Sequence, residues 1–500
     1  MNVWSNIALG FSVISEPMNL VFCFVGVLLG TLIGVLPGLG PGATISLLLP
    51  LTYHLNPVAS VIMVAGIYYG AKYGGSTTSI LLNIPGEADS VVTCLDGYQM
   101  ARQGRAGPAL GIAAFGSFIA GTFATLGLML IAPALAKFAL RFGPPEIFAL
   151  MVLAMTLITF MSSGSQIKGL AMATLGLFLG SIGLDIFENV DRFVFGYNFL
   201  LEGLGIVPVI MGIFGVGEVL ANLEMQSKGE VFEKRVSNLL PSLKDWKDSF
   251  WPIMRGTFIG FFIGLIPGGG GMASTFTSYS VEKRLSRHPE KFGRGAIEGV
   301  AGPEAANNAC SGANFIPLLT LGVPTNGIMA IIFASLLING LQPGPLLIKN
   351  NPALFWGVIA SMYVGNVMLV ILNLPLIGIW VRFLTIPYSV LSPLILFFCI
   401  LGSYTMKNAV PDLVVMLVFG ILGVLMRKFR YEGAPLIMGF IISEMVEGSF
   451  IRSLLMSDGD FSIFFTRPIS CVLMVIALAF FILPFFGKKP KSLGSKDNEK

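Results

Sequence analysis

The chain has 500 residues, of which 54% are hydrophobic and only 12% are charged, and its mean hydropathy is +0.81. Soluble domains carry roughly 25% charged residues, so this composition excludes a soluble globular protein and predicts a polytopic membrane protein. The formal net charge is +4. Lys and Arg gather in a few loops and in the tail, which indicates cytoplasmic flanks rather than a nucleic-acid surface.

Few residues in the chain are suited to metal binding or cross-linking. The five cysteines are scattered and form no CxxC pair, and there are two histidines. This usage argues against a disulfide scaffold, a zinc site and a haem site. Residues 1–71 contain no Lys or Arg. The charged start of a signal peptide is therefore missing, and we expect the first span itself to direct insertion.

Long apolar stretches recur along the whole chain. They predict an all-α polytopic membrane protein with roughly 11–14 transmembrane helices or half-helices. The stretches lie at 18–36, 109–135, 146–161, 167–183, 199–221, 353–381, 388–403, 409–426, 433–447 and 467–486. Alternating segments of about ten residues, as in an outer-membrane barrel, are not the pattern here.

A polar internal stretch divides the chain nearly in half. It mixes Lys and Arg with Asp and Glu, as expected of a cytoplasmic linker between two membrane halves. The predicted organisation is a first membrane repeat at 1–223, a polar linker at 224–252, a second membrane repeat at 253–450, a C-terminal span at 451–487 and a basic cytoplasmic tail at 488–500.

Two glycine-rich segments resemble each other. GVLLGTLIGVLPGLGPGATIS (26–46) and GTFIGFFIGLIPGGGGMASTF (256–276) share six Gly or Pro landmarks at a constant shift of 230 residues. Further on, SILLNIPGE (79–87) resembles LLTLGVPTN (318–326) at a shift of 239. Two halves with matching Gly/Pro-interrupted hydrophobic segments are typical of transporters. We therefore predict two structural repeats in inverted orientation, although the GxxxG spacing also favours close helix packing.

Each Pro-Gly cluster predicts a break in a helix. Backbone of this kind is tolerated in a membrane only inside protein or beside a water-filled cavity. Basic residues flank the second cluster at Arg255 and Lys283, and the interval is too short for two full spans. We expect a re-entrant hairpin with its tip near 267–271 and an equivalent one with its tip near 37–42. A broken helix follows each hairpin, and inverted repeats would bring the two tips together.

Hairpin tips of this kind present free amides, which suit an anion, and free carbonyls, which suit Na⁺. The predicted substrate-binding residues are Gly38, Gly40, Ser76, Thr77, Gly268, Gly269, Gly270, Pro324 and Thr325. The predicted cation-binding residues are Asn307, Asn308, Ser311, Thr44 and Ser274. Structural kinks are the alternative interpretation, and Ser and Thr also bond their own helix carbonyls. No cofactor or metal other than Na⁺ is expected.

Ionisable residues in or near spans are further candidates. The acidic ones are Glu87, Asp89, Asp185, Glu188, Glu218, Glu298, Glu444 and Glu447. Glu304, Asn308 and Ser311 fall on one helical face, which either lines a cavity or begins a helix. Lys72 lies in an otherwise apolar segment, where it either attracts an anionic substrate or extends to the interface.

The chain resembles the large membrane subunit of the tripartite tricarboxylate transporters, the TctA family, over about residues 15–450. The segments that carry the resemblance are GTLIGVLPGLGPGATISLLLP (30–50), YGGSTTSILLNIPGE (73–87) followed by Asp96-Gly97, GTFIGFFIGLIPGGGG (256–271) and EGVAGPEAANNACSGANFIPLLTLGVPTN (298–326). One departure is Thr325-Asn326 after Pro324, where many relatives carry small Gly-like residues, and this leaves the ligand open.

The resemblance implies a multi-pass permease of the bacterial inner membrane that imports tricarboxylates or dicarboxylates by secondary active transport. It further implies a Na⁺ or H⁺ gradient as the driving force, a small TctB-like membrane subunit and a periplasmic TctC-like binding protein as partners, and no nucleic acid. The chain has no GxxxxGK[ST], HExxH or GxSxG motif, so neither ATP hydrolysis nor another enzymatic activity is expected. A carboxylate or anion channel without ion coupling is the alternative.

Overall fold

The computed structural model describes residues 3–36, 40–161, 165–185, 187–224, 238–384 and 388–486. Within these ranges the structure is almost entirely helical, and its sheet is one antiparallel pair of two-residue strands, β1 (Gly183–Leu184) and β2 (Asp191–Arg192). The first half contains α1 (Val3–Ile14), α2 (Pro17–Val35), α3 (Pro41–Tyr53), α4 (Pro57–Leu82), η1 (Ala88–Ser90), α5 (Val91–Arg102), α6 (Ala106–Ala139), α7 (Pro144–Met161), α8 (Gln166–Gly180), η2 (Asn198–Leu200), α9 (Ile206–Ile210), η3 (Met211–Val216) and α10 (Gly217–Glu224).

The second half continues with the same architecture. It contains α11 (Leu243–Gly264), α12 (Gly271–Leu285), η4 (Pro289–Lys291), α13 (Glu298–Ala313), α14 (Phe315–Leu321), α15 (Gly327–Ile338), α16 (Leu347–Asn350), α17 (Pro352–Asn373), α18 (Ile377–Phe383), α19 (Tyr388–Lys407), α20 (Val410–Lys428), α21 (Gly433–Met456), α22 (Ile463–Thr466) and α23 (Pro468–Phe486). The elements η1, η2 and η4 are single 3₁₀ turns, and η3 is a π-helical turn that continues α9 into α10.

Seven helical stretches in the described residues are long and apolar enough to cross a membrane. They are Pro17–Val35, Ala106–Ala139, Ile206–Leu223, Pro352–Asn373, Ser389–Lys407, Val410–Lys428 and Gly433–Met456. Five shorter apolar helices accompany them: Trp4–Ile14, Pro144–Phe160, Gln166–Gly180, Gly327–Ile338 and Pro468–Leu483. The predicted class, an all-α polytopic membrane protein, is therefore confirmed.

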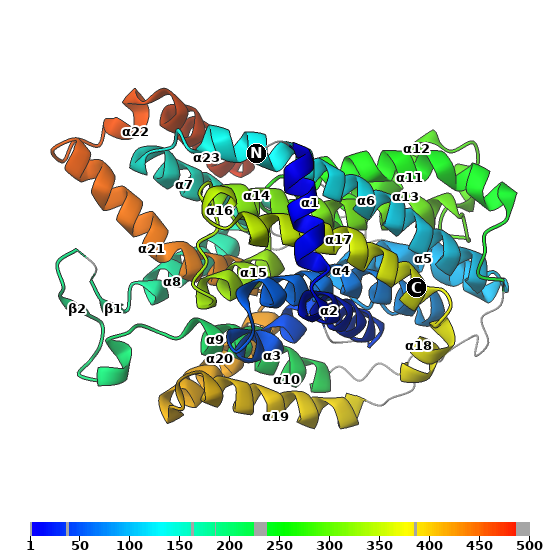
Figure 1. Cartoon of the computed structure of the whole chain (residues 1–500), viewed down its shortest axis with the longest axis horizontal. Helices are drawn as coiled ribbons and strands as arrows, with labels where there is room; N and C mark the ends of the chain where they lie inside the picture. The colour runs from blue at the N-terminus through cyan, green and yellow to red at the C-terminus, as the bar shows by residue number, and fades with distance from the viewer. Residues whose placement is uncertain are drawn as a thin grey trace.

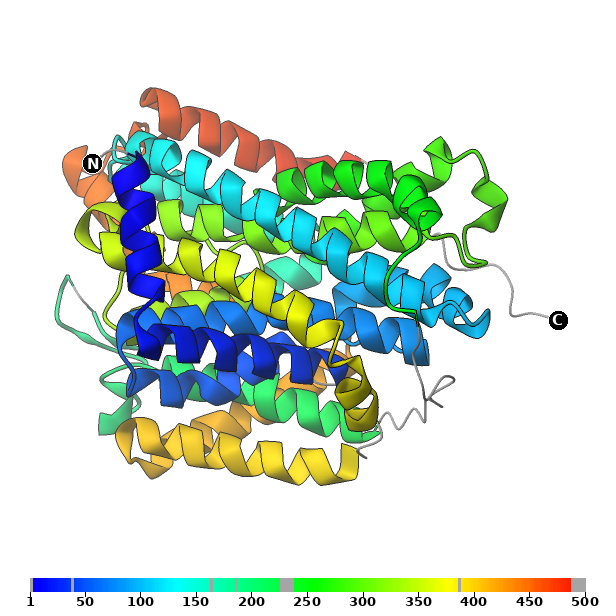
Figure 2. The same cartoon turned by 45° about the vertical axis from the view of Figure 1, so that its right-hand side comes forward.

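The centre of the molecule is formed by α4 and α13. Almost every residue of α4 from Ala59 to Leu82, and every residue of α13 from Gly299 to Ala313, is buried. Helix α4 packs against α2, α6 and α17, and α13 packs against α6, α11 and α12 (Figure 1). By contrast, α19 and α20 lie along one long edge of the molecule in Figure 2 and α23 lies along the opposite edge. These outer helices expose large apolar side chains, including Phe397, Leu417 and Leu478. This is the expected distribution when lipid covers the outside.

Glycine spacing explains how tightly the central helices pack. A Cβ atom on Gly26, Gly30 or Gly34 of α2 would collide with the backbone carbonyl of Met63, Ile67 or Ala71 on α4. In the second half, a Cβ atom on Gly256, Gly260 or Gly264 of α11 would collide with the carbonyl of Gly302, Ala306 or Cys310 on α13. Small residues at such crossings let membrane helices approach closely.

The glycine contacts in the two halves are related by constant shifts in residue number. The three glycines of α2 and those of α11 differ by 230 residues, and their partners on α4 and α13 differ by 239. The two helix breaks match in the same way. Asn83 ends α4 and Gly322 ends α14, each with a left-handed backbone (φ 58° and 70°), and a proline follows two residues later. These contacts support the predicted repeat, and its inverted orientation stays a prediction.

The second glycine cluster forms a helical hairpin. Helix α11 ends at Gly264, α12 begins at Gly271, and the Arg255 guanidinium pairs with the Glu282 carboxylate at 2.5 Å. The two arms of the hairpin therefore lie side by side. Helix α11 begins at Leu243, where Ser242 and Asp245 form a capping box. The last part of the segment predicted as a linker is thus helical, while 225–237 and the predicted tail at 488–500 lie outside the described residues.

We predict that Gly260→Ala lowers the thermal unfolding temperature of the purified chain in detergent. Its Cβ would press on the Ala306 carbonyl, and overpacking of this kind costs about 1–3 kcal/mol. The matched control is Gly378→Ala in α18, because a Cβ there meets no atom within 4 Å. Equal unfolding temperatures for the two variants would contradict close packing of α11 on α13.

Candidate functional site

A buried charge cluster lies beside the centre of α4. The Lys72 ammonium is 1% exposed and donates to Glu87 Oε2 at 2.7 Å and to the Asp89 carboxylate. From α13, the Asn307 amide donates to Glu87 Oε1 at 3.0 Å. Residues of both halves of the chain therefore meet around one lysine. The cluster carries two carboxylates and one ammonium, so its formal charge is negative.

Local sequence explains why the two carboxylates reach Lys72. Asn83 and Pro85 end α4 and turn the chain back along the helix. The returning backbone passes over Gly75, where a Cβ would come within 2.9 Å of Glu87 Cγ. Glu87 and Ser90 then cap the 3₁₀ turn η1 reciprocally. A small residue on α4 and a capped turn thus fix the position of the acidic pair.

Glu304 joins α13 to the first half of the chain. Its carboxyl lies 2.5 Å from the Ser76 hydroxyl of α4 and also accepts from the Thr93 hydroxyl of α5. The Asn308 amide, one turn along α13, donates to Ser117 Oγ of α6 at 2.7 Å. The polar face expected on α13 thus lies in the interior, where it faces α4, α5 and α6 rather than a loop, and its role in a binding site stays a prediction.

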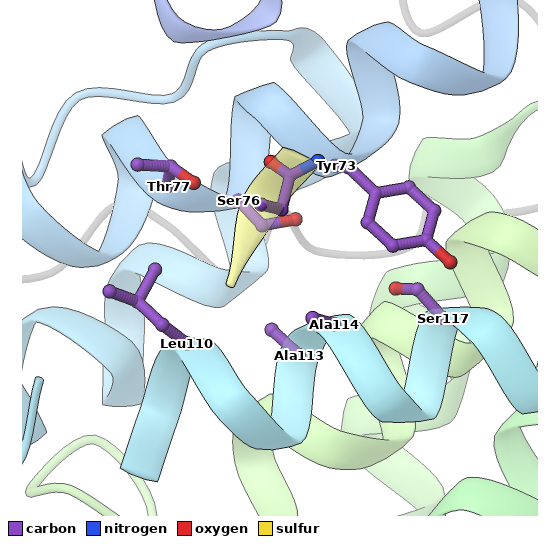
Figure 3. Close-up of a pocket in the computed structure, with 8 residues that line it drawn as sticks. Tyr73, Ser76, Thr77, Leu110, Ala113, Ala114 and Ser117 are labelled. Atoms are coloured by element: carbon purple, nitrogen blue, oxygen red, sulfur yellow. The ribbon is translucent and has the colours of Figure 1, made fainter. Parts of the chain in front are cut away.

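A small cavity of about 10 Å³ lies next to these contacts. Figure 3 shows Ser76 and Thr77 of α4 on one side, and Leu110, Ala113, Ala114 and Ser117 of α6 on the other. Tyr73 and Asn373 complete the lining. The Asn373 Oδ1 atom is buried and has no partner in the structure. The space is about what one water molecule requires, which is far too small for a tricarboxylate in this conformation.

The second hairpin tip contacts the break between α14 and α15. The Gly268 amide donates to the Thr325 carbonyl at 2.7 Å, and the Thr325 hydroxyl donates to Asn314 Oδ1 at 2.9 Å. The amides of Gly269 and Gly270 donate to carbonyls within the tip itself. The structure thus brings Gly268 and Thr325 together, as the predicted site requires. Pro324 is buried beside them.

A carboxylate lies at the start of each helix that follows a glycine cluster. The Gly40 amide donates to Glu218 Oε1 at 2.8 Å, and Glu218 also pairs with Arg427. At the second tip, a Cβ on Gly271 would collide with the Asp89 carboxylate. Both helix N-termini therefore face acidic groups of the chain itself, as the positive end of a helix favours. Gly38 lies outside the described residues.

The predicted cation-binding residues do not share one location. The hydroxyls of Ser311, Thr44 and Ser274 donate to carbonyls of their own helices, which was the alternative stated for such residues. Asn308 is held by Ser117, and Asn307 by Glu87. One exception is Asn307 Oδ1, which is buried and unpartnered. Cation binding at these five residues stays a prediction.

Of the two interpretations of Lys72, extension to the interface is wrong, and attraction of an anionic substrate stays a prediction. The side chain does not extend to an interface, and its charge is already neutralised by Glu87 and Asp89. Of the other acidic candidates, Asp185 and Glu447 pair with Arg192 near the β-hairpin, away from this cluster. Sequence reasoning missed Thr93, Ser117 and Asn373. A single polar residue in an apolar helix cannot be recognised as a site residue from the sequence until the helix that it contacts is known.

These features define a multi-pass membrane protein whose polar groups are gathered in its interior. The model of the tripartite tricarboxylate transporter TctA family matches residues 20–438. The chain therefore belongs to the TctA family, whose members are the large subunits of tripartite transporters and pair with TctB and TctC subunits.

Two proteins of Agrobacterium vitis are similar to the chain. An uncharacterised 52.8 kDa protein of the TAR-I ttuC′ 3′ region is 52% identical over 479 residues, covering 96% of this chain and 95% of that protein. An uncharacterised protein of the TAR-II ttuC′ 3′ region is 49% identical over 224 residues, covering 45% of this chain and 93% of that protein. No solved structure matches the chain significantly.

We predict that Lys72→Met strongly destabilises the chain, because Glu87 and Asp89 would remain buried without their cation. Removing one partner of a buried ion pair costs about 3–5 kcal/mol. The matched control is the triple variant Lys72→Met, Glu87→Gln, Asp89→Asn, which removes all three charges and should recover most of the lost stability. Thermal unfolding of the purified proteins measures both effects. A single variant as stable as the parent would contradict the assignment of this cluster.

Proposed function

We propose that the chain is the large permease subunit of a binding-protein-dependent carboxylate importer in a bacterial inner membrane, driven by an ion gradient. It acts with a small membrane subunit and a periplasmic solute-binding protein, and it catalyses no chemical reaction. Membership of the TctA family supports this proposal. The substrate is a tricarboxylate or dicarboxylate, and the driving ion is Na⁺ or H⁺.

The observation that carries the proposal is the contact between the second hairpin tip and the broken helix. The Gly268–Thr325 hydrogen bond joins two non-helical segments inside a bundle of membrane helices. On the far side of the same break, Gly42 of α3 lies against Ile328 and Ile331 of α15. Both glycine-rich segments thus flank residues 325–331. Irregular backbone inside a bundle of membrane helices is typical of transporter sites.

The start of α15 and the two glycine-rich tips suggest how a substrate carboxylate is bound. Asn326 caps α15 by accepting from the Met329 amide. The amides at the tips already have partners within the chain, namely Thr325 at Gly268 and Glu218 at Gly40. When the tips move away from these partners, a substrate carboxylate would therefore take the place of the Thr325 carbonyl and the Glu218 carboxylate as acceptor. We accordingly assign this conformation to a closed state in which the small cavity excludes the substrate.

Counterflow tests the proposed function. Proteoliposomes that contain the chain and its small subunit are loaded with unlabelled carboxylate, and uptake of radiolabelled citrate or a dicarboxylate is measured with the binding protein present. A carrier gives a transient overshoot of label. Equilibration without overshoot would instead indicate a channel and would contradict the proposal.

We predict that Gly268→Ala reduces counterflow, whereas Gly270→Ala does not. Gly268 has a left-handed backbone (φ 83°), which a side chain disfavours. Gly270 has an ordinary backbone, and a Cβ there meets no atom within 4 Å. The strain of about 1–2 kcal/mol should change the population of the tip conformation and the rate by roughly 5–30-fold. Equal rates for the two variants would show that the tip geometry does not govern transport.

A further inference from the structure

Glu304 is a carboxyl group buried at the centre of the bundle without a cation. It is 1% exposed, and among the described residues no Lys, Arg or His nitrogen pairs with it within 4.0 Å. Within the described part of the chain, its two oxygens meet only hydroxyls, Thr93 at Oε1 and Ser76 at Oε2. A lone ionised carboxylate at such a place is costly, and a neutral carboxylic acid is much less so. The location therefore favours binding of a positive charge to this group.

The charged and titratable neighbours do not supply that charge. Lys72 and Tyr73 of α4, Glu87 before η1 and Cys94 of α5 are close enough to interact with Glu304 electrostatically. Lys72 is the one cation among them, and it is engaged by Glu87 and by Asp89. Tyr73 donates to Asn366 Oδ1 instead. The surroundings of Glu304 thus contain more negative than positive charge.

The hydrogen bonds around Glu304 suit both protonation states. Ser76 Oγ lies 2.5 Å from Glu304 Oε2 and 3.0 Å from the Lys72 carbonyl, and a hydroxyl has one hydrogen to donate. When Glu304 is ionised, Ser76 donates to Oε2. When Glu304 is protonated, Oε2–H donates to Ser76, and the Ser76 hydrogen turns to the Lys72 carbonyl. No heavy atom has to move, so a proton can be bound and released reversibly.

The small cavity lies next to Glu304, and Ser76 connects the two. Ser76 bonds Glu304 and also lines the cavity, whose other polar groups include Ser117 and the unpartnered Asn373 Oδ1. A space of this size admits one water molecule, and Asn373 and Ser76 are polar partners for it. A proton can then pass between that water and Glu304 through the Ser76 hydroxyl.

We propose that Glu304 binds the coupling proton of the transporter. The inference rests on the proposed function and specifies its driving ion. A proton from the outer side of the membrane joins Glu304 Oε2 before or during substrate entry, and it leaves to the cytoplasmic side when the carboxyl ionises. Ser76 and Thr93 are positioning residues, because they bond the carboxyl in either state. Because Ser76 lies on α4 and Thr93 on α5, whereas Glu304 lies on α13, proton binding also depends on how the two halves of the chain pack together.

The test compares Glu304→Gln with Glu298→Gln in proteoliposomes that contain the small subunit and the binding protein. Glu298 is the matched control because it lies on the same helix, partly exposed, at its start. With an inward pH gradient, we expect the parent and Glu298→Gln to accumulate carboxylate above the external concentration. Glu304→Gln should equilibrate without accumulation, while its counterflow stays within a factor of about two and loses its dependence on pH.

The possible results distinguish a failure of proton binding at Glu304 from a failure of the proposed importer function. Accumulation by Glu304→Gln equal to that of the parent under the pH gradient would overturn proton binding at Glu304 and leave the importer intact. Accumulation by the parent with a Na⁺ gradient alone would likewise overturn proton binding at Glu304 and leave the importer intact. Absence of counterflow in the parent with every carboxylate tested would overturn the proposed function instead.

Protonation of Glu304 can also be measured directly, without transport. Infrared difference spectra of the purified chain between alkaline and acidic pH should show the C=O band of a buried carboxylic acid, and Glu304→Gln should remove it. If that variant does not fold, Thr93→Val takes its place. Loss of this hydroxyl donor destabilises the ionised form, so the midpoint of the band should move to higher pH. An unchanged midpoint, or no such band in the parent, would overturn the inference.

Discussion

The structure depends on the close approach of α2 to α4 and of α11 to α13. Three glycines on each outer helix place backbone against backbone, which no larger residue at these positions allows. Helices α4 and α13 are consequently shielded from lipid on every side, and they can carry Ser, Thr, Asn, Lys and Glu. Their neighbours at the periphery carry the large apolar side chains instead.

Shielding from lipid also explains the chemistry of the interior. Polar groups in such a place are costly unless they find partners inside the protein. Lys72 is satisfied by the two carboxylates that the break after α4 returns to it. Glu304 and Asn308 are satisfied by hydroxyls from α4, α5 and α6. The contacts of Glu304 and Asn308 therefore cross between the two halves, and relative movement of the halves would exchange these partners.

Much of this architecture could be predicted from the sequence because it is encoded locally. Proline and glycine fix the helix breaks at Pro85 and Pro324, and the shifts of 230 and 239 residues recur in the glycine contacts. The polar face that begins at Glu304 also follows from helical spacing. Long-range partners could not be predicted. Nothing near Gly40 indicates that Glu218 will lie against its amide, and an isolated Thr93 in α5 resembles any other helical threonine.

Because the cavity beside α4 is too small for the substrate, the interior must open there during transport. This opening is the step on which the proposed function depends. It can be tested with Thr77→Cys, in a chain whose five native cysteines are replaced. Thr77 is buried and lines the small cavity. The rate of modification by a membrane-permeant thiol reagent is measured in the assembled transporter. We predict slow modification without substrate, and a changed rate when a transported carboxylate is present at concentrations that saturate uptake. A rate that stays the same over that range, while uptake saturates, would show that the interior beside α4 does not open during transport.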